Sequence, residues 1–526
     1  MSPRSVHPDG YELASRSYSY SEASYNLDDG DFEAQVPRAS RLGRRRVTWL
    51  QQLFPTAFAG PRRRHPRSRR VVANTRFRPP CLPRFYLRRR FFYYIHVFLG
   101  IILALLILTA IFNPSYSRPP PHYTTLRSLA QRTNKAGRGN PRNEKVFIAA
   151  SLYDRSGELA GGGWATQLLQ LIDMLGDDNV FVSIYENDSG AEGVSALRGF
   201  EKQLTCRKSI IFEEHLNPQS LSTVIVPGGD KRVKRIEYLA QVRNKALEPL
   251  EADPTVRYDK ILYLNDIMFD PIDALQLLFS TNVDTDGRAQ YRAACAVDFD
   301  NAFKFYDTYA TRDLQGYSMG LPFYPWFTTA GSGESRRDVQ AGKDAVRVRS
   351  CWGGMVAFDA KYFQNPLPES FSPARFRSAS DLFWDSSECC LIHADIQDHP
   401  INVDDIVDTG IYMNPFIRVA YDSRTLFWLG LTKRFEKLYS IIHNIGNHLV
   451  GMPWDNPRRT EVPGQSVPET VWIPDDRQNG GGSFQVIQRI AGHDGFCGRQ
   501  GLQVIVENRL PGQKGFESIP APLPLP

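Results

Sequence analysis

The stretch KILYLNDIMFDPIDALQLLFS, residues 260–280, carries the pattern that decides the fold class. Its apolar opening at 260–266 has the length of a buried β-strand, and a helix is predicted to follow at 271–280. A strand followed directly by a helix is the repeating unit of parallel sheets that are covered by helices on both faces.

The same alternation extends in both directions along the chain. Spaced apolar residues mark one face of a helix from Trp164 to Leu175 and of another from Ile236 to Leu250. Further strands are predicted at 145–153, 180–186, 209–214, 294–299 and 353–358. We therefore predict an α/β domain over 144–455, with a mainly parallel sheet and flanking helices. Ligands of such sheets bind beyond the carboxyl ends of the strands, so the polar residues found there are the candidates for a site.

The residues that close the strand at 260–266 are the first candidates. Asn265 and Asp266 end this strand, and Asp270 comes shortly after them. A carboxylate at a strand end is suited to a divalent cation with hard oxygen ligands, and the cation would neutralise a nucleotide diphosphate. Alternatively, these residues only form a turn and cap the helix that begins at Pro271, a role that suits Asp270.

Polar residues next to two other elements are candidates for donor binding. Arg243 and Asn244 lie close to the apolar stripe of the 236–250 helix, where an arginine must be paired or face a ligand. Arginine suits a phosphate or carboxylate, although a structural ion pair is the simpler alternative. Glu186 and Asp188 could bond a ribose or a base, or could instead form an Asx-turn loop.

The segment SCWGGMVAF, residues 350–358, holds paired glycines in front of a strand. Gly353 and Gly354 would let a ligand approach the backbone closely, and Trp352 offers a ring face to a sugar. The alternative is a β-bulge.

A cluster of titratable residues occurs in DLFWDSSECCLIHADI, residues 381–396. His393 is a candidate metal ligand, and Glu388 and Asp385 are candidate catalytic carboxylates near the transferred sugar. The alternative is a helix cap with surface charges.

One segment has the length and composition of a membrane span. Residues 91–112 contain no Asp, Glu, Lys or Arg, and about 20 apolar residues suffice to cross a bilayer. Residues 1–90 hold 19 Arg, no Lys and 7 acidic residues, which predicts a disordered basic cytoplasmic segment. The positive flank therefore predicts a type II protein with an uncleaved anchor and a luminal C-terminus. Attraction of the basic segment to anionic lipid explains its charge without a nucleic-acid partner.

The part of the chain beyond the span suits an oxidising compartment. It holds six cysteines, an even number, whose pairing cannot be read from the sequence. It also holds one glycosylation sequon at Asn187, which overlaps the candidate donor-binding segment. Residues 113–143 form a Pro- and Gly-rich stem, and 456–526 are predicted to be mostly irregular, with one possible strand pair at 484–490 and 502–507.

Nine motifs, in order, resemble one family, the fungal capsule-associated α-1,3-mannosyltransferases of glycosyltransferase family 69. They are KVFIAASLYD, VSIYENDSG, IEYLAQVRNKALEPL, KILYLNDIMFDPIDALQLL, YRAACAVDF, FKFYDTYATRDLQGYSMGLPFYPWF, VRSCWGGMVAFDA, WDSSECCLIHADI and NPFIRVAYD, within residues 144–423. The resemblance implies a GT-A-like fold, GDP-mannose as donor, Mn²⁺ as the divalent cation, a glycan acceptor and Golgi residence. It also implies retention of configuration in capsule or cell-surface glycan synthesis.

The resemblance also suggests roles for individual residues. Asp266 stands where GT-A enzymes carry their metal-binding Asp-x-Asp motif, but Leu264 replaces the first acid, so other ligands such as His393 are needed. Arg243 and Asn244 match an Arg-Asn pair of such enzymes, and the WGGM segment matches a wall of the acceptor or donor-sugar site. Asp298 of YRAACAVDF is a further candidate for donor binding.

Two other functions fit the same motifs. One is a transferase that uses another donor, such as UDP-xylose. The other is an inactive, membrane-anchored glycan-binding or scaffold protein. A panel of donors distinguishes them.

Overall fold

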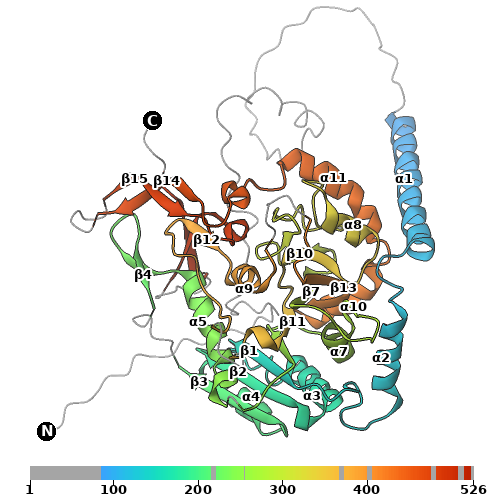
Figure 1. Ribbon diagram of the computed structural model, residues 1–526. Helices are drawn as coiled ribbons and strands as arrows, with labels where there is room; N and C mark the ends of the chain where they lie inside the picture. Colours follow the sequence, from blue (N-terminus) through green and yellow to red (C-terminus); the bar gives the residue numbers. More distant parts are fainter. Residues whose placement is uncertain are drawn as a thin grey trace, which may run out of the picture. The chain divides into compact units, whose positions relative to one another are not determined.

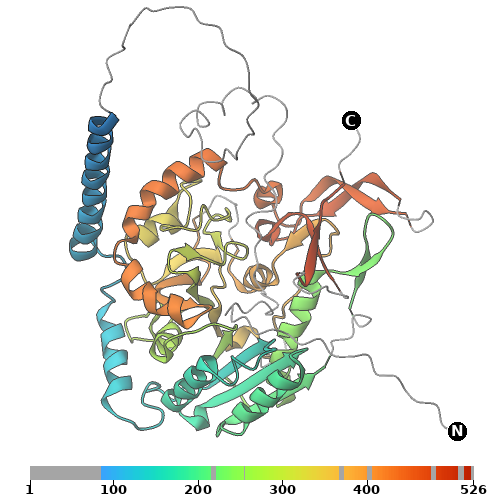
Figure 2. The ribbon, with the colours of Figure 1, turned by 180° about the vertical axis from the view of Figure 1, so that it is seen from behind.

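The computed structural model describes residues 84–214, 221–253, 255–365, 372–399, 406–475, 481–506 and 514–522 (Figures 1 and 2). Residues 109–526 form one unit, and residues 30–108 form a second unit whose described part belongs to helix α1. The predicted cytoplasmic segment 1–90 lies outside the described residues, except for its last seven residues, which begin α1.

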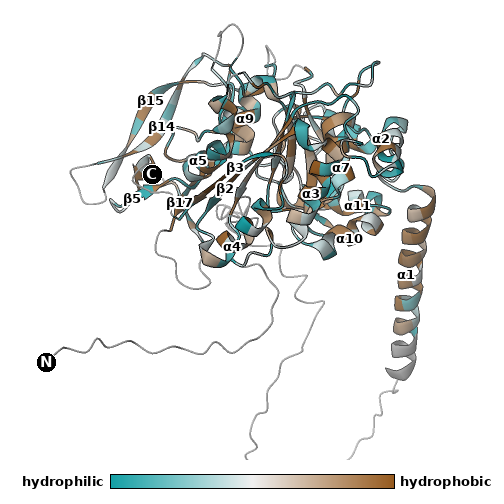
Figure 3. Ribbon diagram, turned by 90° about the horizontal axis from the view of Figure 1, so that it is seen from below, coloured by the Kyte–Doolittle hydropathy of each residue, from teal (hydrophilic) through white to brown (hydrophobic). Residues whose placement is uncertain are grey.

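Helix α1 (Arg84–Phe112) contains the predicted span. Its part from Arg90 to Phe112 is long and apolar enough to cross a membrane, and none of its apolar window is buried against protein. Much of α1 is brown in the hydropathy view of Figure 3. At 1.5 Å per residue these 23 residues extend about 35 Å, enough for the hydrocarbon core of a bilayer.

A ten-stranded sheet forms the centre of the 109–526 unit. Its strands, in order across the sheet, are β3 (Arg207–Glu213), β2 (Val180–Asn187), β1 (Val146–Leu152), β6 (Lys260–Leu264), β11 (Met355–Asp359), β7 (Ala293–Asn301), β13 (Ile411–Ala420), β10 (Val346–Ser350) and β9 (Arg312–Asp313), with β8 (Lys304–Phe305) paired to β7.

The sheet is mixed but mostly parallel. Strands β3, β2, β1 and β6 run in the same direction, as do β7 and β13. Strand β11 is antiparallel to both β6 and β7, between which it lies. The mainly parallel α/β sheet with flanking helices that we expected is therefore confirmed, although β8, β10 and β11 run against the majority, a direction that apolar periodicity does not reveal.

Hydrophobic layers cover both faces of the sheet. Successive β1 residues alternate between them: Phe147 belongs to one cluster and Ile148 to the other, as the period of a strand requires. One layer is completed by α2 (Pro121–Arg132), α3 (Gly163–Leu175), α4 (Gly190–Glu201) and α7 (Pro271–Ser280). The other is completed by α5 (Arg235–Leu247), α6 (Pro249–Ala252), α8 (Glu334–Gln340), α9 (Glu388–Ile396) and α10 (Ser423–Thr432).

Local chemistry explains the boundaries of the segment that set the fold class. Asp270 caps α7 through its Oδ1 atom, which accepts the Ile272 N–H at 2.9 Å. Pro271 occupies the first turn, where its missing N–H costs no helical hydrogen bond. The predicted helix at 271–280 and the capping role of Asp270 are confirmed.

The remaining elements lie mostly at the edges of this core. Helix α11 is followed by the C-terminal strands, and β12 pairs with β16. Their bounds are β4 (Thr223–Ile225), β5 (Lys231–Val233), β12 (Trp384–Ser386), α11 (Tyr439–Val450), β14 (Ser466–Pro474), β15 (Gly482–Ile490), β16 (Gly498–Gln500), β17 (Leu502–Ile505) and β18 (Phe516–Ile519). Short 3₁₀ turns are η1 (Asp177–Asn179), η3 (Ala360–Tyr362), η4 (Glu436–Leu438), η5 (Pro457–Thr460) and η6 (Gly495–Cys497).

The C-terminal segment is more regular than the sequence indicates. Its strands lie close to the two predicted stretches, but the predicted pairing of 484–490 with 502–507 is wrong. Strand β15 pairs with β14, and β17 pairs with β18. Each pair therefore joins strands that follow one another along the chain.

Candidate active site

The carboxyl ends of the parallel strands bring the strand-end candidates to one edge of the sheet. Strands β2, β1 and β6 are consecutive neighbours. Strand β11 contributes its amino end there, because it is antiparallel and Met355 lies opposite Leu264. The Asn265 N–H donates to the Gly354 carbonyl at 2.9 Å, so the turn with the two glycines lies beside Asp266.

Asp266 follows β6 at this edge and is partly exposed. Burial raises the pKa of Asp266 to about 6, the Arg243 guanidinium lowers it, and the Asp154 carboxylate raises it. A neighbouring acid and a partial loss of water thus penalise the charged form of Asp266. A bound cation would remove that penalty, so the oxygen donors fit a divalent metal.

Asp154 is a candidate that the sequence reasoning missed. It stands two residues beyond β1 and is buried. Its Oδ2 atom accepts the N–H groups of Leu159 at 3.0 Å and Ala160 at 2.9 Å. Burial raises its pKa, and these backbone donors oppose the rise. The signal was present, since Asp154 closes the apolar run of KVFIAASLYD as Asp266 closes that of KILYLND.

The turn after β2 is held to the end of β1. The Asp154 N–H donates to the Ser189 hydroxyl at 2.8 Å, and Glu186 Oε1 accepts the Ser189 N–H at 2.7 Å. Glu186 is buried, and Asp188 adopts a φ of 63°, which suits a turn residue. Glu186 therefore shapes the turn, while Asp188 follows β2, next to the end of β1 that carries Asp154.

The sequon asparagine is buried within the same turn. The Asn187 amide donates to the Glu213 carbonyl at 3.3 Å, and its Oδ1 atom accepts the Tyr238 hydroxyl at 2.5 Å. Only 4% of Asn187 is exposed. The side chain is therefore committed to packing and is not presented for glycosylation in this structure.

Arg243 and Glu388 form a buried ion pair. Arg243 Nε donates to Glu388 Oε1 at 2.9 Å, and the two side chains are 0% and 2% exposed. The guanidinium also lies over the Trp352 ring, with its carbon 4.3 Å from the ring centroid. The structural ion pair considered for Arg243 is thus present, and its partner is the residue expected to be a catalytic carboxylate.

Asn265 connects this pair to the strand end. Its Oδ1 atom accepts from Arg243 Nη1 at 3.3 Å and from Trp352 Nε1 at 3.2 Å. Its carbonyl accepts from Trp164 Nε1 at 3.0 Å. Arg243 therefore hydrogen-bonds to the residue immediately before Asp266, and this bond holds the end of β6 in position.

The WGG segment packs against protein. Trp352 is fully buried, so neither ring face is open to a sugar in this structure. Gly353 has a φ of 59°, and a Cβ atom there would lie 2.0 Å from the Ala296 carbonyl oxygen. At Gly354 a Cβ atom would lie 2.8 Å from Ile267. Both positions therefore require glycine because neighbouring protein atoms, and not a ligand, occupy the space of a side chain.

Asn244 and Asp298 have partners inside the protein. The Asn244 amide donates to the Phe376 carbonyl at 2.8 Å and its oxygen accepts the Phe376 N–H at 2.9 Å, which fixes that loop. Asp298 is buried on β7, where it accepts the Asp307 N–H and the Tyr421 hydroxyl.

Asp385 lies in β12. Strand β12 pairs with β16 of the C-terminal segment, with Asp385 opposite Arg499. Burial raises the pKa of Asp385, while Arg499, Lys234 and Arg235 lower it. Three basic side chains and the Tyr309 hydroxyl thus surround Asp385.

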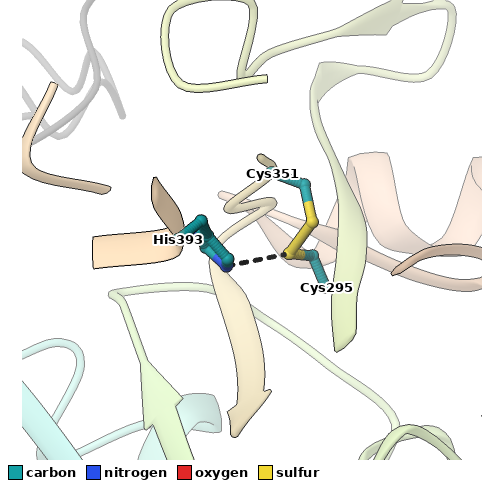
Figure 4. Close-up of side chains that lie close together, drawn as sticks. All are labelled: Cys295, Cys351 and His393. Atoms are coloured by element: carbon teal, nitrogen blue, oxygen red, sulfur yellow. Dashed lines mark hydrogen bonds between the residues drawn. A yellow bond between two sulfur atoms is a disulfide. The ribbon is translucent and has the colours of Figure 1, made fainter. Parts of the chain in front are cut away.

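His393 does not lie in an oxygen-rich site. It is fully buried on α9, and its Nδ1 atom donates to the Cys389 carbonyl at 2.6 Å. The other ring nitrogen lies 3.9 Å from Cys295 Sγ, which is bonded to Cys351 (Figure 4). Disulfide sulfurs cannot serve as thiolate ligands, and burial lowers the pKa of His393 to about 4. Its surroundings do not support the expected role as a second metal ligand.

A small, open pocket lies elsewhere, between the segment after α9 and the C-terminal segment. It is lined by Arg349, His399, Arg458, Arg459 and His493 among others, and by none of the predicted site residues.

Comparison with known proteins agrees with the motifs at this edge. Residues 145–395 match the family model described as Cryptococcal mannosyltransferase 1. This region of the chain belongs to that family. All of the predicted site residues lie within it, and the resemblance to the capsule-associated mannosyltransferases is confirmed. The protein is therefore a glycosyltransferase.

Solved structures with similar folds are distant in sequence. Mannosyltransferase PcManGT from Pyrobaculum calidifontis, in complex with GDP-Man and Mn²⁺, is 11% identical with a TM-score of 0.30, covering 68% of this chain and 77% of its own. Glucosyl-3-phosphoglycerate synthase from Mycobacterium tuberculosis, with Mg²⁺ and uridine-diphosphate, is 11% identical with a TM-score of 0.29, covering 71% and 96%. Mannosyl-3-phosphoglycerate synthase from Rubrobacter xylanophilus is 12% identical with a TM-score of 0.27, covering 72% and 94%. No curated protein matches the chain.

Proposed function

We propose that this protein is a type II membrane mannosyltransferase that transfers mannose from GDP-mannose to a glycan acceptor. The product would be α-1,3-linked, with the configuration of the donor retained. The reaction would take place in the Golgi lumen, in the synthesis of capsule or cell-surface glycans.

One observation carries the proposal: in a member of a mannosyltransferase family, Asp266 and Asp154 close two neighbouring parallel strands. Each carboxyl has a pKa that burial raises, and the charge of Asp154 contributes to the rise at Asp266. Two such acids at a strand-end edge are suited to share one divalent cation.

In this proposal Asp266 holds the cation, with Asp154 as a second oxygen donor. When bound, the cation would neutralise the donor's diphosphate and the charge that develops on it as the glycosidic bond breaks. Asp188 would contact the nucleoside. Because Glu388 already neutralises Arg243, we assign this pair a positioning role, through Asn265, for the strand end that carries Asp266.

Three features support the membrane and luminal parts of the proposal. The span from Arg90 to Phe112 follows an Arg-rich segment, which favours a cytoplasmic N-terminus. Cys295–Cys351 and Cys390–Cys497 are disulfides, which persist in oxidising compartments. Both lie beyond the span, as a luminal domain requires.

The first test is a donor panel with the full chain in nanodiscs. GDP-mannose, UDP-xylose and UDP-glucose would be supplied with Mn²⁺, and release of nucleoside diphosphate measured with and without glycan acceptors. Release from GDP-mannose alone is expected. Release only from UDP-xylose would overturn the donor assignment, and the absence of release from any donor would favour the scaffold alternative.

The second test separates the cation site from the fold. Asp266→Ala is expected to abolish transfer and Mn²⁺ binding while the unfolding transition is retained, because its side chain is partly exposed at the sheet edge. Asp270→Asn is the matched control, since asparagine also caps helices, and it should leave transfer intact. A folded Asp266→Ala protein with normal transfer would remove the metal assignment.

A further inference from the structure

Helices α10 and α11 expose an unusual amount of apolar surface. Phe427 on α10 and Leu449 on α11 are each 77% exposed. Other large apolar side chains on the two helices and just after them are also exposed: Trp428, Leu431, Ile441, Ile442, Ile445, Val450 and Trp454. We call these nine side chains the apolar face. Single exposed apolar residues are normal, but Ile441, Ile442, Ile445 and Leu449 recur at helical spacing on one side of α11, and such a stripe marks an interaction surface.

Helix α11 buries its polar side and exposes its apolar side, the reverse of a helix on the surface of a water-soluble protein. Among its twelve residues only His443 and Asn447 are buried, and both are polar. His443 Nε2 lies 3.1 Å from the Trp326 carbonyl, and Asn447 Oδ1 accepts the Leu321 N–H at 2.8 Å. The polar stripe is thus fixed to the protein by hydrogen bonds, and the isoleucines and leucine point away from it.

The end of the predicted span lies next to these helices. Only three residues separate Phe112, the last residue of α1, from Tyr116, which is buried in the hydrophobic core. Lys437, in the turn between α10 and α11, donates to Asn113 Oδ1 at 2.7 Å. Four peptide steps extend at most about 14 Å, so α10 and α11 cannot be far from the membrane that α1 would cross.

We propose that the apolar face rests in the interfacial layer of the same bilayer that α1 spans. The occupant is phospholipid. Trp428 and Trp454 suit the headgroup level. This inference rests on the proposed membrane anchor, and it adds that the catalytic unit lies against the bilayer through a second, non-spanning contact.

Photo-crosslinking in the full chain tests the contact. The protein would be reconstituted in nanodiscs of phosphatidylcholine and phosphatidylserine, with p-benzoylphenylalanine replacing Phe427 or Leu449. Replacement of Ile107 within α1 is the positive control, and replacement of Val486 on the C-terminal hairpin, which is 68% exposed, is the matched water-facing control. Covalent lipid adducts are then quantified by mass spectrometry.

Positions 427 and 449 are expected to give about tenfold more lipid adduct than position 486, because an interfacial helix buries its apolar side in the acyl boundary. Adducts at 107 but not at 427 or 449 would overturn the contact and leave the anchor standing. No adduct at 107 would remove the anchor and this inference with it. Adducts between two protein copies at 427 and 449, without lipid, would assign the face to self-association and overturn the proposal.

Discussion

The buried Arg243–Glu388 pair makes the sharpest prediction, because it separates a structural carboxylate from a catalytic one. In Glu388→Gln the Arg243 guanidinium would keep its charge while losing the carboxylate 2.9 Å from Nε. The side chain of Arg243 is 0% exposed, so water cannot replace that partner. Breaking a buried pair from one side costs about 3–5 kcal/mol.

The double variant Arg243→Met/Glu388→Leu should recover most of that loss. It removes both charges and keeps apolar volume against Trp352, whose Nε1 still donates to Asn265 Oδ1 at 3.2 Å. Replacing a buried pair by apolar residues is often neutral, so the coupling energy from the double-mutant cycle of Arg243→Met, Glu388→Leu and their combination should be at least about 2 kcal/mol. Urea denaturation of the full chain in detergent measures each free energy of unfolding, with unchanged m-values as the check for two-state behaviour.

Two results would refute this reasoning. If Glu388→Gln unfolds at the wild-type urea midpoint, the pair does not stabilise the fold. If that variant is also inactive with the donor still bound, Glu388 acts on the substrate and the positioning role is wrong.

Three further predictions follow from single sites. Gly353→Ala should lose at least about 2 kcal/mol of stability, because the φ of 59° at this residue disfavours a side chain and Ala296 leaves no room for one. The control Gly199→Ala on α4, whose new side chain would meet nothing within 4 Å, should not destabilise the protein. Equal urea midpoints for the two variants would contradict this prediction. His393 has a folded pKa of about 4, below its unfolded value, so its stabilisation is present near pH 7 and is lost as the pH falls. Between pH 7 and 5 this loss should reach about 2 kcal/mol and should be absent in His393→Phe; identical pH profiles of stability would count against it. Because Asn187 is buried and hydrogen-bonded, treatment with a peptide N-glycosidase should not change the electrophoretic mobility of the chain when it is expressed through a secretory pathway, and a shift lost in Asn187→Gln would contradict the buried position of Asn187.

The sequence was most informative where structure depends on neighbouring residues. The strand at 260–264 and the capped helix after it follow from apolar runs, a proline and one carboxylate within a few positions of each other. Asp266 was predicted by the same logic, because an acid that ends a buried strand is visible without knowing the strand's partners, and the structure places it at the end of β6. The apolar segment at 91–112 is equally local, since its length and lack of charge are its whole signal.

The tertiary structure decided everything that joins distant residues. The pairing of Arg243 with Glu388 spans 145 positions, and the sulfurs beside His393 come from β7 and from the residue after β10, which only the fold brings together. The antiparallel direction of β11 and the outward apolar side of α11 also leave no mark in periodicity, because a pattern shows that a face is apolar but not what covers it. Local propensity determines which segments form helices and strands. Which residues pair across the fold depends on how polar and apolar surface is buried in the whole structure.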